Sequence, residues 1–109
     1  QASRICQVLH SSGYTIHPLS NWDAGKLTFD KEEILSMAKL EHELWCQWKR
    51  EGGWQYGTPR NDQQKIHPDL VPWEKLKNTE RDKNTNTIIG LPALLAGLGF
   101  QIDKYQTSR

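Results

Sequence analysis

The segment from residue 30 to residue 51 most constrains the fold, because it carries a complete set of helix signals. Asp30 and Glu33 have the spacing of a capping box, in which each side chain satisfies a backbone N–H at the helix start. Apolar residues then recur at helical spacing, and basic residues occupy the last turn, where they suit the negative end of the helix dipole. The Gly52-Gly53 pair follows and ends the pattern. We therefore predict one long helix over residues 30–51.

The rest of the chain offers shorter signals, and together they predict a mainly α domain of three to four helices with a long ordered loop. A small β pairing is compatible with the same pattern. Gly90 and Pro92 interrupt the last helical stretch. Proline has no backbone N–H to donate inside a helix, and it is favoured in the first turn of a new helix. The shorter elements expected are a helix over 2–12, a strand over 14–16 that ends at Pro18, a helical turn over 73–76, helices over 78–89 and 92–99, and a strand over 100–102.

Residues 54–72 make up the long loop, with turn-forming residues, three prolines and no helical period. A connection of this length is usually functional or disordered, and its aromatic and aliphatic residues favour an ordered, packed loop. Within it we expect a short strand pair near Tyr56 and His67, with His67 donating a hydrogen bond to a loop carbonyl. Gly53 and Gly57 each lie beside a bulky aromatic residue, so we expect both in backbone conformations that a side chain would disfavour.

At 109 residues the chain is long enough for a single domain with a modest core. Its net charge of +1 gives no general attraction to nucleic acid, and no apolar run approaches the ~20 residues of a membrane span. Two cysteines make no disulfide framework, which favours a cytoplasmic setting. Since the chain begins at Gln1 and its only methionine is Met37, we expect a piece of a longer protein. It divides into a lead-in with a short helix and strand (1–29), a domain (30–102) and a frayed tail (103–109).

The residues that could support catalysis or metal binding do not form a recognisable set. His42 and Cys46 lie one helical turn apart, as in a zinc-binding helix, but a tetrahedral site needs further ligands and no other histidine has matching spacing. We expect instead that His42 hydrogen-bonds to a neighbouring loop and that Cys46 is a small buried residue. No serine lies in a nucleophile-elbow pattern, and no glycine-rich loop begins a helix. We therefore expect no catalytic residues, no metal and no cofactor, and so a protein that is not an enzyme.

Aromatic residues are concentrated in one window, since four of the five tryptophans lie between residues 45 and 73. Large aromatic side chains need either a core or a ligand to cover them. We expect Trp54 and Trp73 in the core, whereas an exposed Trp45 beside Lys49 and Arg60 could stack a purine ring while the cations meet its phosphates. The run Arg60-Asn61-Asp62 could alternatively form a capped turn whose aspartate accepts backbone hydrogen bonds. The candidate ligand-binding residues are Trp45, Trp48, Lys49, Trp54, Tyr56, Arg60 and Trp73.

The same window resembles the RyR domain, the ryanodine-receptor repeat, in an ordered series of short motifs. The resemblance covers about residues 30–102, and Asn61 stands where the family has an acidic residue. It implies a single-copy domain of the bacterial or phage type. In the family, the helix that bears the tryptophan matching Trp45 lies at the contact between paired repeats, where a small ligand can bind. The motifs are His42-Glu43-Leu44-Trp45, Gly53-Trp54-Gln55-Tyr56-Gly57, Arg60-Asn61-Asp62, His67-Pro68-Asp69-Leu70-Val71-Pro72-Trp73 and Leu94-Leu95-Ala96-Gly97-Leu98-Gly99-Phe100.

From these observations we expect a non-enzymatic binding or sensor module of a larger protein, which recognises a small nucleotide-like ligand at an aromatic groove. The alternative is a purely structural or protein–protein interaction domain without a ligand. We also expect pairing, either as a homodimer in which the helix carrying Trp45 and Trp48 faces its symmetry mate, or with another RyR-like repeat. Nucleic acid and membranes are not expected partners of this domain.

Overall fold

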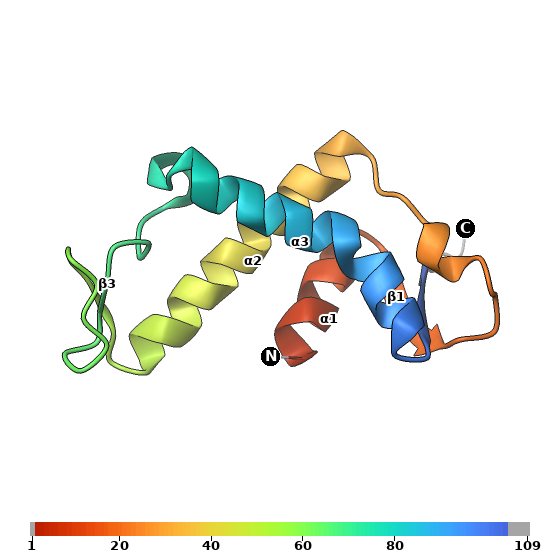
Figure 1. The fold of residues 1–109 in the computed structure, drawn as a ribbon, viewed down its shortest axis with the longest axis horizontal. Helices are drawn as coiled ribbons and strands as arrows, with labels where there is room; N and C mark the ends of the chain where they lie inside the picture. The colour runs from red at the N-terminus through yellow and green to blue at the C-terminus, as the bar shows by residue number, and fades with distance from the viewer. Residues whose placement is uncertain (1, 105–109) are drawn as a thin grey trace.

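The computed structural model describes residues 2–104, which fold into three α-helices and two small two-stranded sheets (Figure 1). This confirms the predicted mainly α fold with a minor β pairing. Within the described residues, no helix is both long enough and apolar enough to cross a membrane. The elements are α1 (Ala2–Ser11), β1 (Tyr14–Pro18), α2 (Lys31–Glu51), β2 (Gln55–Tyr56), β3 (Ile66–His67), α3 (Asn78–Gly97) and β4 (Phe100–Lys104), with 3-10 turns at Ala24–Lys26 and Trp73–Lys75.

Helix α2 forms as the sequence predicts. The Asp30 carboxylate accepts a hydrogen bond from the Glu33 N–H (2.8 Å), and the Glu33 carboxylate accepts one from the Asp30 N–H (3.0 Å). Both donors would otherwise lack a partner in the first helical turn. At the other end the chain leaves the helix through Gly53, whose φ of +91° is a conformation that favours glycine. The predicted conformation of Gly53 is thus confirmed.

Helix α3 corrects the prediction of two helices separated at Gly90 and Pro92, because it is continuous from Asn78 to Gly97. Pro92 has no N–H to donate to the carbonyl of Ile88, so the helix forgoes one internal hydrogen bond there. Ile88, Leu91 and Pro92 are all buried against the core. Burial of this face stabilises a helix whose local sequence favours an interruption, since tertiary packing supplies most helical stability in proteins.

The core lies where the three helices meet, and α2 and α3 cross near the middle of the molecule (Figure 1). Tyr14 packs edge-on against Phe29 with ring centres 5.0 Å apart, and its hydroxyl donates to the Glu33 carboxylate (2.8 Å). Burial, together with this carboxylate, raises the pKa of Tyr14 to about 12. The buried core residues are Val8, Leu9, Tyr14, Phe29, Met37, Ala38, Trp73, Leu76, Ile88, Leu91 and Ile102.

The N-terminal segment is built into the same folded unit as the region that follows it. Strand β1 pairs antiparallel with β4, with Ile16 opposite Ile102, and α1 is joined to α2 by an ion pair between Arg4 and Glu41 (2.9 Å). Strand β4 continues to Lys104, beyond the boundary at 102 expected from the sequence. The rest of the expected tail, 105–109, lies outside the described residues.

The long loop is ordered and carries the strand pair expected near Tyr56 and His67, in which β2 and β3 run parallel. Gly57 has no positive φ, so its predicted conformational role is wrong. It is instead required by close approach, because a Cβ at this position would lie 2.6 Å from Cγ2 of Ile66. The glycine therefore allows the two strands to come together.

This packing predicts opposite effects of alanine at two glycines. Gly57→Ala should lower the free energy of unfolding by about 1–3 kcal/mol, because the added methyl group overlaps Ile66. Gly90→Ala should raise it by about 0.5–1 kcal/mol, since this helical position faces open space and alanine loses less backbone entropy on folding. Urea denaturation measures both changes. Pairing Gly57→Ala with Ile66→Ala relieves the overlap, and a neutral Gly57→Ala would contradict the close approach.

Candidate functional site

The C-terminal half of α2 and the loop after it bring several aromatic rings around one ammonium group. Lys49 Nζ lies 4.1 Å from the ring centre of Trp54, 5.2 Å from that of Trp48 and 5.8 Å from that of Trp45. These distances are within the range of cation–π attraction. The backbone fixes the arrangement, because the Trp54 N–H donates to the Lys49 carbonyl (3.0 Å) where the chain turns back after α2. We call Trp45, Trp48, Lys49 and Trp54 the Lys49 surface.

His42 holds the end of the loop against α2. Its Nε2 donates to the carbonyl of Val71 (2.7 Å), and the ring is buried. Cys46, one turn further along, is buried as well, and burial raises the pKa of its thiol, which keeps it protonated. The expected roles of His42 as a loop anchor and Cys46 as a small buried residue are therefore confirmed. Among residues 2–104, no three His, Cys, Asp or Glu side chains are grouped so that they could hold a metal ion.

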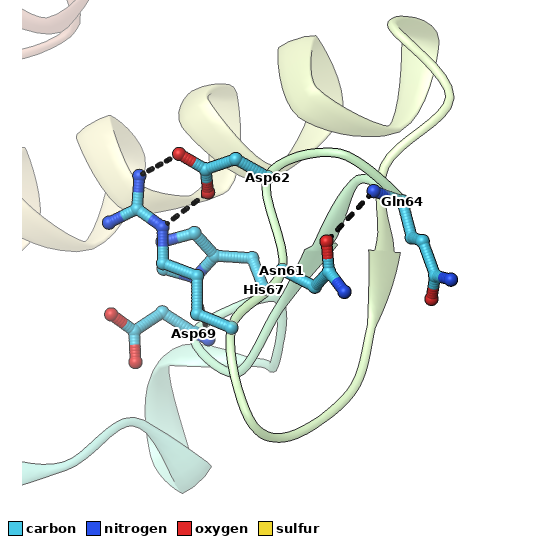
Figure 2. Close-up of polar contacts among 6 residues, drawn as sticks. Asn61, Asp62, Gln64, His67 and Asp69 are labelled. Carbon is cyan, nitrogen blue, oxygen red and sulfur yellow. Dashed lines mark hydrogen bonds and ion pairs between the residues drawn. The ribbon is translucent and has the colours of Figure 1, made fainter.

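His67 corrects a second expectation. Its Nδ1 accepts a hydrogen bond from the Asp69 N–H (3.0 Å), whereas the sequence predicted that the ring donates to a carbonyl (Figure 2). The ring packs edge-on against Trp45, with centres 5.0 Å apart. Burial lowers the pKa of His67, with Arg60 and Lys49 acting in the same direction against the carboxylates of Asp69 and Asp62. At neutral pH the imidazole is therefore uncharged, with its proton on Nε2.

The turn at residues 60–64 is capped, but by a different residue than expected. The side-chain oxygen of Asn61 accepts from the Gln64 N–H (3.0 Å), as Figure 2 shows. Asp62, the expected cap, instead accepts from Arg60, with Nε to Oδ1 at 2.8 Å. This ion pair lowers the pKa of Asp62, and Lys49 contributes to the same effect. Arg60 is thus already paired with a carboxylate, and its charge is partly offset.

The candidate residues predicted from the sequence do not line a single groove. Trp45, Trp48, Lys49 and Trp54 meet at the Lys49 surface. Trp54 is only partly buried and is not part of the core, which corrects the expectation for this residue. Trp73 is buried in the core, as expected, on the other side of His42. Tyr56 and Arg60 are exposed on the loop.

A hollow of about 350 Å³ opens beside the Lys49 surface, between the rings of Trp48 and Trp54. Its lining includes Lys49 and one acidic residue, Glu51, and two further basic groups lie nearby. The guanidinium group of Arg4 lies 5.7 Å from the centre of the Trp48 ring, and Lys65 Nζ donates to the carbonyl of Gly52 (2.8 Å). This hollow therefore combines aromatic surface with positive charge.

A second hollow, of about 240 Å³, lies on another side of Trp45, and we call it the Trp45 hollow. It is formed by α2, the segment around His67 and the N-terminal half of α3. Apart from Trp45, sequence reasoning proposed none of its residues for a site. The i, i+4 spacing of Glu41 and Trp45 indicated one wall, but nothing in the sequence shows that α3 supplies another. The lining includes Glu41, Trp45, His67, Asp69, Glu80 and Lys83.

In a comparison with known protein families, the family model of the RyR domain matches residues 24–104. This range covers most of the chain, including the Lys49 surface and the Trp45 hollow. It begins at the 3-10 turn Ala24–Lys26, ahead of the start at residue 30 expected from the sequence.

The environment of His67 predicts how stability depends on pH. Folding lowers the pKa of His67 below the value of about 6.5 that the residue has in the unfolded chain. The contribution of His67 to the free energy of unfolding is therefore complete above about pH 6.5 and is lost as the pH falls below this value. The free energy of unfolding should therefore decrease between pH 7.5 and 5.5 in urea titrations. His67→Gln should reduce this decrease, whereas His17→Gln, at an exposed position of β1, should retain it. An equal pH dependence in His67→Gln and in the wild type would contradict the assignment.

Proposed function

Because this chain belongs to the RyR domain family, we propose that it is a binding module of a larger protein and recognises a small nucleotide-like ligand at the Lys49 surface. The observation that carries the proposal is the position of Lys49 Nζ among the rings of Trp45, Trp48 and Trp54. A cytoplasmic setting suits its two free cysteines, Cys6 and Cys46.

The Lys49 surface offers both parts of such a recognition site. Trp48 is 44% exposed, so its ring is accessible for stacking by a planar base. Stacking of a base on an aromatic side chain contributes about 1–3 kcal/mol and depends little on which base is bound. Lys49 and Arg4 lie next to the same ring, where they can meet a phosphate group. An uncharged ligand would make no use of the charge of Lys49, which forms no ion pair within residues 2–104, whereas Arg4 is already paired with Glu41 (2.9 Å).

The chemistry of the nearby side chains supports binding without catalysis. The Cys46 thiol is buried and its pKa is raised, so it is a poor nucleophile at neutral pH. The Nδ1 of His67 is occupied by a backbone N–H, and Asp62 is paired with Arg60. The Cys46 thiol, the His67 Nδ1 and the Asp62 carboxylate are thus each buried or already engaged in a contact within the domain. We propose no catalytic residue for the domain.

The alternative function, a protein–protein interaction domain without a small ligand, is favoured by a different observation. Trp48 and Tyr56 are both exposed, as are apolar residues on α3, so the domain has aromatic and apolar surface that a partner could cover. The partner would be a second copy of the chain or another RyR-like repeat, with α2 at the contact. In that case Trp48→Ala should shift a dimer toward the monomer in sedimentation experiments, whether or not nucleotides are present.

Titration calorimetry with ATP, adenosine and inorganic triphosphate tests the ligand proposal. The wild type should bind ATP more tightly than adenosine. Lys49→Met keeps the aliphatic stem and removes the charge, so it should weaken ATP binding about tenfold and leave adenosine binding unchanged. Trp48→Ala should weaken both.

Trp22→Ala is the matched control, because Trp22 is an exposed tryptophan in the loop before α2, outside the Lys49 surface. It should bind all three probes as the wild type does. ATP affinity that is the same in Lys49→Met, Trp48→Ala and the wild type would rule out the Lys49 surface as the site.

A further inference from the structure

We infer that the Trp45 hollow is a second binding site, and that it takes the guanidinium group of an arginine residue in a partner peptide. The inference is independent of the nucleotide proposal, because it concerns another side of Trp45 and the opposite charge. Three features of the hollow support it: the charges of its lining residues, the hydrogen bonds of Asp69 and His67, and the indole ring of Trp45.

The hollow lies between two helices and one loop, which together give it three walls. Glu41 and Trp45 come from α2, and Glu80 and Lys83 come from the first turns of α3. His67 and its neighbour Asp69 close the third side. At about 240 Å³ the space suits one side chain better than a whole folded element.

The charges around the hollow are predominantly negative. Its lining includes the carboxylates of Glu41, Asp69 and Glu80. Glu41 is paired with Arg4 (2.9 Å), and Glu80 is paired with Lys83 (3.1 Å). These pairs leave one carboxylate unbalanced.

That carboxylate belongs to Asp69. Within residues 2–104 its side chain takes part in no ion pair and accepts no hydrogen bond, although its backbone N–H is bonded to His67 (Figure 2). A guanidinium group can offer a carboxylate two parallel N–H donors, which makes this pairing strong and directional. Phosphate, by contrast, would meet three carboxylates and a single lysine.

The aromatic wall supports the same ligand. Trp45 is partly buried, and its ring lines the hollow between Glu41 and His67. A planar guanidinium group stacks on an indole ring by cation–π attraction, so Trp45 and Asp69 can engage one arginine side chain together. Lys49, near the same ring, belongs to the Lys49 surface and is absent from the lining of the hollow.

His67 indicates that the arginine is part of a peptide. The residue is 8% exposed and lines the hollow, and its Nδ1 already accepts from the Asp69 N–H. Its Nε2 therefore carries the proton, and no group within residues 2–104 accepts from it. This N–H reaches solvent, because no fully buried side-chain polar atom among the described residues lacks a partner. A backbone carbonyl next to an arginine side chain can accept from it, whereas a lone guanidinium ion has only donors.

The test compares N-acetyl-arginine methylamide with its citrulline counterpart, which has nearly the same shape and no charge. In amide-resolved NMR titrations the arginine compound should shift the signals of residues lining the hollow, and the citrulline compound should not. Guanidinium chloride should bind more weakly than the arginine compound, because it lacks the carbonyl. Equal shifts with citrulline would overturn the charge recognition, and equal affinity for guanidinium would overturn the peptide assignment.

Asp69→Asn provides the matched variant, because it keeps the side-chain shape and the backbone N–H that supports His67. It should weaken binding of the arginine compound about tenfold, the effect of losing a charge-assisted bidentate contact. Asp23→Asn, an exposed acid outside the hollow, should bind as the wild type does. Unchanged affinity in Asp69→Asn would overturn the site. Loss of ATP binding with arginine binding retained would affect the proposed function alone.

Discussion

The hydrogen bond from His42 to the carbonyl of Val71 is the contact on which the arrangement of this domain depends. The segment between α2 and α3 has little regular structure of its own, so its position must come from contacts with the helices. His42 fixes its end, and just beyond it Trp73 enters the core. Midway, His67 packs against Trp45. In Figure 1 this segment (green) lies at the end of the molecule farthest from the β1–β4 sheet.

Trp45 lies between two surroundings of opposite charge, and for this reason we propose ligands of different chemistry for the two. Lys49 approaches its ring from the C-terminal end of α2, with Trp48, Trp54 and Arg4 nearby. The carboxylates of the Trp45 hollow come from three elements, with Glu41 on α2, Asp69 on the loop and Glu80 on α3. Over such short distances in a partly buried site, each group of charges is only weakly screened and favours groups of the opposite sign. The net charge of +1 conceals this separation, because it averages the two sides.

Much of the fold could be predicted because its signals are local. The capping box at Asp30 and the glycines after Glu51 define α2 from neighbouring residues alone. The strand pair at Tyr56 and His67 was expected within a loop whose aromatic and aliphatic residues favour ordered packing. The continuity of α3 could not be predicted, since local chemistry at Pro92 favours a break and only burial overrides it. The two candidate sites differ in the same respect, since one is local in sequence and the other is not. Lys49 and its tryptophans lie close in sequence, whereas the Trp45 hollow requires Glu80 and Lys83 to be brought against α2 by the tertiary fold.

The arrangement of both candidate sites therefore depends on the loop being held as firmly as the helices that it joins. Native-state hydrogen exchange measures this directly, because it reports how often each backbone N–H loses its hydrogen bond. The amides of Trp54, Ile66 and Asp69 donate to Lys49, Asn61 and His67, so they should be protected to a degree comparable with amides inside α2. In His42→Leu, which removes the anchor, their protection should fall while that of α2 persists. Exchange of these loop amides at unprotected rates in the wild type, with α2 intact, would contradict the central claim.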